Sequence, residues 1–294
     1  MFLPWHRHFI NKFEQELRKV NANVTLPYWD WSLDAAHPEK SPILSSKYMG
    51  SSSQGGCIPD GPFKNFTVKG NCVKRTFNPN PPKTITTFHS TSLLGELIRK
   101  NYTSYDEFRS AIEGSPHGVP HTFIGGDMST MRSPADPLFY LHHAFIDKLW
   151  NDFQQENNKQ FLNKYVSDPK SAQLIGYTGV NVADVLNLES MCVQYVMAGA
   201  IVDSPDSITW NVPAPAPLDD DWLKINHMNS TEVRKQETEI KQMQNKVIED
   251  GKKGNIPPAP GYNDTYKKDE TNSGVSFETS LGLALLIGFV LNLF

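Results

Sequence analysis

A pair of histidines stands in the segment SPHGVPH, at positions 117 and 121. On a helix, His117 and His121 leave the same face about one turn apart, because an α-helix turns once every 3.6 residues. Two imidazole nitrogens in that arrangement can bind one metal ion. Pro116 and Pro120 are compatible with the first helical turn, whose amides have no partner within the helix. The spacing indicates a metal site, with a chance surface or core pair as the alternative.

Two adjacent histidines follow in the apolar segment DPLFYLHHAFIDKLW. If His142 and His143 are buried, their imidazoles need polar partners, which a metal ion or a hydrogen bond can supply. Neighbouring helical residues point about 100° apart, so only one of the two can face a given metal ion. The other is then expected to support a ligand. Asp147, four residues after His143, can orient a ligand imidazole or cap a basic group.

The opening stretch, MFLPWHRHFINKFEQEL, supplies one further candidate. His6 shares the helical register of the apolar residues and is the inward candidate, whereas His8 is expected to be exposed. Three more histidines lie in loops or polar segments and are expected at the surface: His37, His89 and His227. The candidate ligands are all imidazoles, without HExxH or a thiolate pair. Such a set suits copper, zinc or iron, and the ligand chemistry alone does not choose among them.

The elements that must position these histidines are predicted helices. Apolar periodicity predicts them over residues 6–20, 105–113, 117–124 and 138–155. The last has a clear start, with Asp136 as cap and Pro137 at the first helical position. Residues 45–85 are dense in Ser, Gly, Pro and Asn and predict a long irregular stretch. The expected fold class is mainly α, with much ordered loop.

These segments together resemble a known family. HGVPH followed by IGGDMSTMRSPADPLFYLHHAFIDKLW is similar to the second copper site of the tyrosinase, catechol oxidase and molluscan haemocyanin family. FLPWHRHFINKFEQEL resembles the end of the family's first copper motif, and LPYWDWSLD resembles the segment that follows it. DVLNLESMCVQYV resembles the close of the catalytic domain. The resemblance covers about residues 1–200, in the family's order.

The resemblance implies a four-helix bundle around two copper ions, with three histidines per ion. By position, His6 matches the third ligand of the first copper, and the second copper site is complete. Its ligands are His117, His121 and His143. The family's other two first-site ligands precede the PWHR segment. We therefore expect that Met1 falls inside the motif, that the chain is N-terminally incomplete, and that these 294 residues bind at most one copper well and lack oxidase activity.

Three further positions bear on the reaction that the resemblance implies. Glu113, four residues before His117, matches a family glutamate that holds a water for uptake of the phenolic proton; an ordinary helix-end glutamate is the alternative. Where the family has an Asn after the first histidine, this chain has Gly118, which favours o-diphenol oxidation over monophenol hydroxylation. Thr130 stands where some members place a bulky gate, so we expect an open entrance for aromatic substrates.

The expected function is the copper-dependent oxidation of o-diphenols to o-quinones by O₂, and oxidation of monophenols stays open. Two alternatives stay open. A haemocyanin-like O₂ carrier uses the same ligands without turnover, and a non-catalytic structural relative would be stabilised by one copper or none. The net charge of −4 gives no electrostatic support for nucleic-acid binding.

Cysteines and glycosylation sequons point to the secretory pathway. Cys57 and Cys72 are a plausible disulfide pair, while the pairing of Cys192 stays open. N-x-T sequons occur at Asn23, Asn65, Asn101, Asn229 and Asn263. We expect an extracellular or cell-surface protein, although no signal peptide precedes Met1.

Composition divides the chain into three zones. Residues 1–215 form the expected copper-binding domain, and residues 216–272 form a polar tail ending in a Pro/Gly-rich linker. A helix over 230–250 is predicted within that tail, with apolar residues seven apart, typical of a docked or stalk helix. Residues 273–294 end in LGLALLIGFVLNLF, which resembles a GPI-attachment signal; a short membrane-anchoring helix and a core helix are the alternatives.

Overall fold

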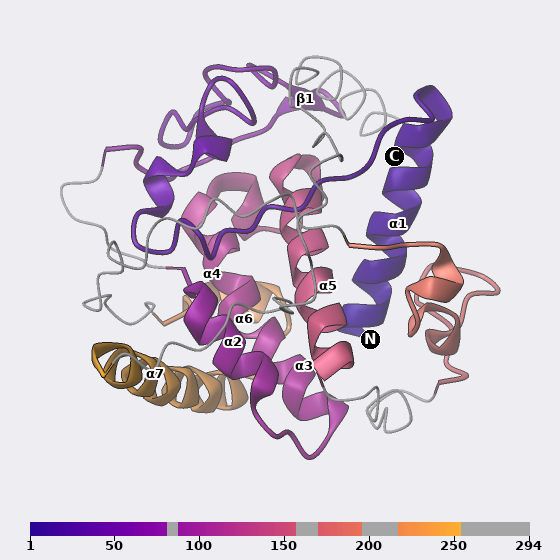
Figure 1. Ribbon diagram of the computed structural model, residues 1–294. Coiled ribbons are helices and arrows are strands. Elements are labelled where there is room, and N and C mark those ends of the chain that lie inside the picture. Colours follow the sequence, from indigo (N-terminus) through magenta and orange to yellow (C-terminus); the bar gives the residue numbers. More distant parts are fainter. Residues whose placement is uncertain (81–87, 157–169, 196–216, 254–294) are drawn as a thin grey trace, which may run out of the picture.

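The computed structural model describes residues 1–80, 88–156, 170–195 and 217–253, and all structural statements below concern these residues. Helices dominate, and long ordered loops connect them (Figure 1). The mainly α fold class is confirmed. The helices are α1 (Phe2–Val20), α2 (Thr91–Arg99), α3 (Tyr105–Glu113), α4 (Ser115–Ile124), α5 (Leu138–Glu156), α6 (Asp220–Ile225) and α7 (Ser230–Lys252).

Helix α5 forms the centre of the fold, and α1 and α2 pack against it (Figure 1). Residues on all sides of α5 are buried, most of them apolar or aromatic, as expected for a helix in the interior of a protein. Its start is fixed by Asp136, whose carboxylate accepts the N–H of Leu138 at 2.9 Å. The same carboxylate binds the Arg75 guanidinium through two 2.8 Å contacts, and both side chains are fully buried.

Helix α1 is tied to α5 by a buried arginine. The Nε of Arg7 donates to Asp147 at 2.6 Å, and its guanidinium lies 3.6 Å from the ring centroid of Trp150. Nη1 of Arg7 donates to the carbonyls of Val185 and Leu186, and Nη2 donates to Oε1 of Gln154. Because these partners satisfy the charge, the arginine can be buried between two helices and the segment that closes over them.

The loop between α1 and α2 is irregular but well organised, as the sequence predicts. It contains one short hairpin, β1 (Thr67–Val68) with β2 (Asn71–Cys72), and a disulfide between Cys57 and Cys72. Hydrogen bonds join the loop to the turn after α4, among them a reciprocal pair: Asp127 N–H donates to the Lys74 carbonyl at 2.9 Å, and Lys74 N–H donates to the Asp127 carboxylate. These contacts hold the turn that follows α4.

Two histidines expected at the surface are buried. His8 is 7% exposed because Tyr177 packs edge-on against it, with ring centroids 4.4 Å apart. His89, just before the α2 cap residue Ser90, is fully buried, and burial lowers its pKa to about 3. A residue distant in sequence covers the His8 ring, so the local polarity of its surroundings was misleading. His37 and His227 are exposed, as expected.

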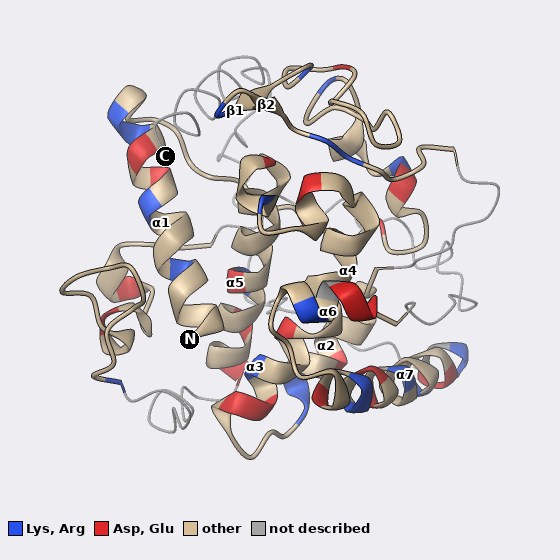
Figure 2. Ribbon diagram, turned by 180° about the vertical axis from the view of Figure 1, so that it is seen from behind, with Lys and Arg blue, Asp and Glu red and all other residues tan. Residues whose placement is uncertain are grey.

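Helix α7 corresponds to the helix predicted over 230–250, and it is docked. Val233, Ile240 and Val247 are buried, and α7 packs on α2, α3 and α4 (Figure 1). Charged residues gather on its outer side (Figure 2). The sequence analysis did not identify α2 or α6.

No helix in the described ranges is long and apolar enough to cross a membrane. The apolar segment 281–294 and the sequon at Asn263 lie outside those ranges, so both interpretations stay predictions.

Candidate metal centre

Four buried histidines converge where α4 meets α5. One nitrogen from each ring lies within 4.8 Å of the corresponding nitrogens of the others. Helix α4 supplies His117 and His121, whose ring centroids are 4.7 Å apart on one helix face. Helix α5 supplies His142 and His143. Segments about twenty residues apart in sequence thus present a compact set of nitrogen donors.

Backbone carbonyls orient the two imidazoles of α4. Nδ1 of His117 lies 3.0 Å from the Glu113 carbonyl, and Nδ1 of His121 lies 2.8 Å from the Met128 carbonyl. A carbonyl only accepts, so both Nδ1 atoms carry the proton and both Nε2 atoms present a lone pair. Anchoring of one ring nitrogen in this way is typical of metal-binding histidines.

The separation of two Nε2 atoms fits a single metal ion. Nε2 of His121 lies 3.4 Å from Nε2 of His143. Two ligand nitrogens, each about 2.0–2.1 Å from a tetrahedral ion, are themselves about 3.4 Å apart. Nδ1 of His143 is buried without a hydrogen bond in the described structure. A neutral ring that carries its proton on Nδ1 presents the lone pair of Nε2, which is the nitrogen that faces His121.

Hydrogen bonding distinguishes the adjacent histidines of α5. The Trp31 indole N–H donates to Nδ1 of His142 at 3.1 Å, so the proton of this neutral ring is on Nε2. Neither nitrogen of His142 then offers a free lone pair to a metal ion. The His142 ring instead stacks against the His117 ring, with the two centroids 5.4 Å apart. This pattern favours His143 over His142 as a metal ligand.

Burial keeps the donor set neutral. Desolvation lowers the pKa of His121 to about 4 and moves the pKa values of His117 and His143 well below the usual histidine value. At neutral pH the ligand lone pairs are therefore not occupied by protons. Neutral imidazoles in an apolar setting suit copper, zinc or iron. The donor set thus fits the copper expected from the sequence.

His6 lies beside this group rather than within it. Its ring stacks on His143, with centroids 4.1 Å apart and planes within 8°. Nδ1 of His6 lies 2.9 Å from the Phe2 carbonyl, which leaves Nε2 as the available donor. Desolvation lowers the pKa of His6 to about 4. Its assignment to a neighbouring copper ion stays a prediction.

The other predicted residues occupy varied positions. Burial raises the pKa of Glu113, and its carboxylate pairs with Arg109 one turn earlier on α3. Gly118 is buried within α4. Thr130 is exposed on the turn after α4, where its hydroxyl donates to the Asp127 carbonyl at 3.0 Å. The structure therefore gives Thr130 a turn-stabilising contact.

Asp147 caps a basic group, which is one of its two predicted roles. Its carboxylate accepts hydrogen bonds from Arg7 and, at 2.7 Å, from the Tyr195 hydroxyl. Neither bond reaches an imidazole.

Trp31 was not predicted as a site residue, and its partner His142 is 111 residues away. The neighbouring tryptophans of LPYWDWSLD were the available signal, because a buried indole N–H requires an acceptor.

Comparisons with known proteins agree with this site. Residues 1–156 match the family model described as the common central domain of tyrosinase. The tyrosinase of Streptomyces antibioticus is 35% identical over 203 residues, covering 63% of this chain and 69% of that protein. The tyrosinase of Streptomyces glaucescens is 34% identical over 174 residues, covering 53% of this chain and 63% of that protein. Grixazone synthase of Streptomyces griseus is 33% identical over 196 residues, covering 51% and 63%. The chain belongs to the tyrosinase family.

Proposed function

We propose that this chain is the copper-binding part of a phenol oxidase that converts o-diphenols, and monophenols less readily, to o-quinones with O₂. The observation that carries this proposal is the convergence of three available imidazole lone pairs on α4 and α5 in a chain of the tyrosinase family. The family implies two copper ions. When bound, copper supplies the activation of O₂ and the electron transfer.

The chain's own residues would hold and shield the metal. His117, His121 and His143 bind the second copper, and His6 contributes to the first. The carbonyls of Glu113 and Met128 keep two of these rings in place. Aromatic rings surround the donors: Phe2 packs against His117 with centroids 4.7 Å apart, and Phe139 against His143 at 4.2 Å. These side chains exclude water from the ligands.

The surroundings of Glu113 support a preference for o-diphenols. A monophenol must transfer its phenolic proton to a base or to a water held near the site. The carboxylate of Glu113 is engaged by Arg109, and Gly118 offers no side-chain amide to help it hold a water. An o-diphenol is a substrate that needs only oxidation, so this arrangement affects it less.

The decisive test is catechol turnover by copper-loaded protein expressed from its natural transcript. We expect quinone formation, detected by absorbance, and its loss in the His143→Ala variant. Reversible O₂ uptake without quinone would instead support a carrier. Copper binding without either activity, or no copper binding, would support a structural relative.

We also propose that the protein passes through the secretory pathway to the extracellular space or cell surface. The Cys57–Cys72 disulfide and exposed acceptor residues support this location. The exposed acceptors are Asn23, Asn65, Asn101 and Asn229. Removal of N-glycans should increase the electrophoretic mobility of the natural protein. Release by a phosphatidylinositol-specific phospholipase would test attachment through residues 273–294.

A further inference from the structure

We infer that helix α7 positions His117 of the metal centre, and that Gln236 is the main contact through which it does so. The inference rests on the metal site of the proposed function. Helix α7 lies beyond the residues matched by the family model, which end at residue 156. It nevertheless packs on the two helices whose junction leads into His117, α3 and α4 (Figure 1).

Two contacts join α7 to the corner between α3 and α4. The side chain of Gln236 is only 8% exposed, and a methyl group added at Gly114 would lie 2.6 Å from its Oε1 atom. Gln236 therefore fills the space that the absent side chain of Gly114 leaves free. One turn earlier, a carboxylate oxygen of Glu232 accepts the Ser110 hydroxyl at 2.7 Å.

The same corner sets the direction of the His117 ring. Gly114 is the single residue between α3 and α4, and its N–H donates to the Ser110 carbonyl at 3.0 Å. The preceding carbonyl, that of Glu113, lies 3.0 Å from Nδ1 of His117. The Gly114 carbonyl accepts the Gly118 N–H at 2.9 Å, within the first turns of α4. A shift of Gly114 would thus turn the carbonyl that anchors the ligand.

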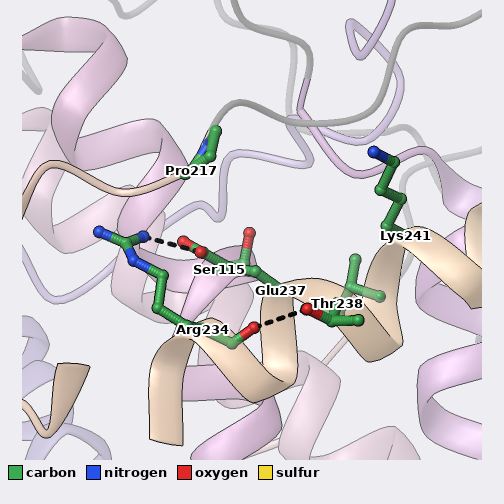
Figure 3. Close-up of a pocket in the computed structure, with 7 residues that line it drawn as sticks. Ser115, Pro217, Arg234, Glu237, Thr238 and Lys241 are labelled. Carbon is green, nitrogen blue, oxygen red and sulfur yellow. Dashed lines mark hydrogen bonds and ion pairs between the residues drawn. The ribbon is translucent and has the colours of Figure 1, made fainter. Parts of the chain in front are cut away.

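The packing between α7 and α4 is not tight everywhere around this corner. A cavity of about 310 Å³ lies between Ser115 at the start of α4 and residues 234–241 of α7 (Figure 3). Arg234 lines this cavity and forms ion pairs with Glu237, at 2.7 Å, and with Asp220. Tight contact at Gln236 beside an open cavity makes this glutamine the point where α7 restrains the corner.

Helix α7 also contains a matched control. Gln244, two turns after Gln236, is buried to a similar extent, with 7% exposed. It lies on the part of α7 where Lys246 pairs with Glu96 of α2, at 3.7 Å. Replacing either glutamine with alanine removes the same atoms from the same helix, so the two variants separate corner positioning from general loosening of α7.

The experiment compares Cu(II) binding by the 294-residue chain with that of Gln236→Ala and Gln244→Ala. Affinity is measured by competition with a chelator, and the copper coordination by electron paramagnetic resonance. Partners that orient a ligand typically change metal affinity about 10–100-fold, so we expect a loss of roughly five- to tenfold for Q236A. We expect less than about a twofold change for Q244A, and faster amide exchange at Gly118 only in Q236A, even without metal.

Unchanged copper affinity in Q236A, or equal losses in both variants, would overturn the inference while leaving the proposed function intact. Failure of the unaltered chain to bind Cu(II) would overturn the metal site and the inference together. If Q236A does not fold, Glu232→Ala removes the other corner contact from an exposed position. An approximately twofold loss of Cu(II) affinity in this variant would then support positioning of His117 by α7, and an unchanged affinity would refute it.

Discussion

The two helices that meet at the metal centre orient their histidines in different ways. On α4, the ring of each histidine is anchored by a carbonyl close in sequence: Glu113 for His117 and Met128 for His121. On α5, the ring of His142 is oriented by Trp31, 111 residues away. Helix α5 itself is held by Arg7, 140 residues from its partner Asp147. The α4 ligands are thus positioned mainly by local backbone, and α5 by contacts across the fold.

This difference predicts which changes damage the whole fold and which damage only the site. Long-range contacts on α5 connect separate segments, so their loss should lower the free energy of unfolding. Changes confined to the ligands should mainly affect copper.

The largest effect on stability is expected for Asp147→Asn. The substitution removes the charge that compensates the buried Arg7 guanidinium, and breaking such a pair typically costs about 3–5 kcal/mol. Urea denaturation measures the change. Asp106→Asn is the control, because Asp106 pairs with Arg109 at a partly exposed site and should lose under about 1 kcal/mol. Equal losses in the two variants would contradict the long-range anchoring of α5.

Copper should stabilise the chain through the ligand set. At a free concentration one hundred times the dissociation constant, a ligand that binds only the folded state adds about 2.7 kcal/mol. Thermal unfolding with copper and with excess chelator measures this difference. We expect His143→Gln to abolish the stabilisation of the folded chain by copper, since this substitution removes a donor nitrogen. His142→Gln should retain most of it; if it does not, His142 is a ligand and the assignment by Trp31 fails.

A smaller effect is expected for Trp31→Phe. Loss of the indole N–H leaves a buried acceptor on His142 without its partner, which costs about 1–3 kcal/mol. Trp29→Phe is the matched control, because Trp29 is buried in the same segment and its indole nitrogen forms no hydrogen bond with a histidine. The free energies of unfolding of the two variants, obtained from denaturation curves, should differ by the cost of the unpaired nitrogen. Coinciding curves would show that the Trp31 bond contributes nothing.

The smallest effect concerns the reaction. Gly118→Asn supplies the side-chain amide that the family resemblance places after the first histidine of the second site. We expect a severalfold rise in monophenol hydroxylation relative to o-diphenol oxidation, with little change in copper affinity. Rates with paired substrates such as tyrosine and its o-diphenol measure the ratio. An unchanged ratio would show that Gly118 does not determine this preference.

Helices that depend on a pattern within one segment of the chain could be predicted from the sequence. The helix predicted over 105–113 has the observed bounds, and the helix predicted over 138–155 ends one residue early. Apolar periodicity and the Asp136 cap suffice there, because both act between neighbours in the chain. Helix α6 was missed because its six residues are too few for a periodic pattern. Helix α2 carried such a pattern after the Ser90 cap, but it was not recognised.

The sequence by itself determined that His117 and His121 share a helix face, and its motifs placed the chain in a copper family. Only the tertiary structure decided that Trp31 donates a hydrogen bond to His142 and that His8 and His89 are buried. It also decided that α7 packs against the junction of α3 and α4 that precedes His117. The physical reason is the range of the interactions. Helical spacing follows from backbone geometry over a few residues, whereas burial and hydrogen-bond partners depend on segments that meet only in the folded chain.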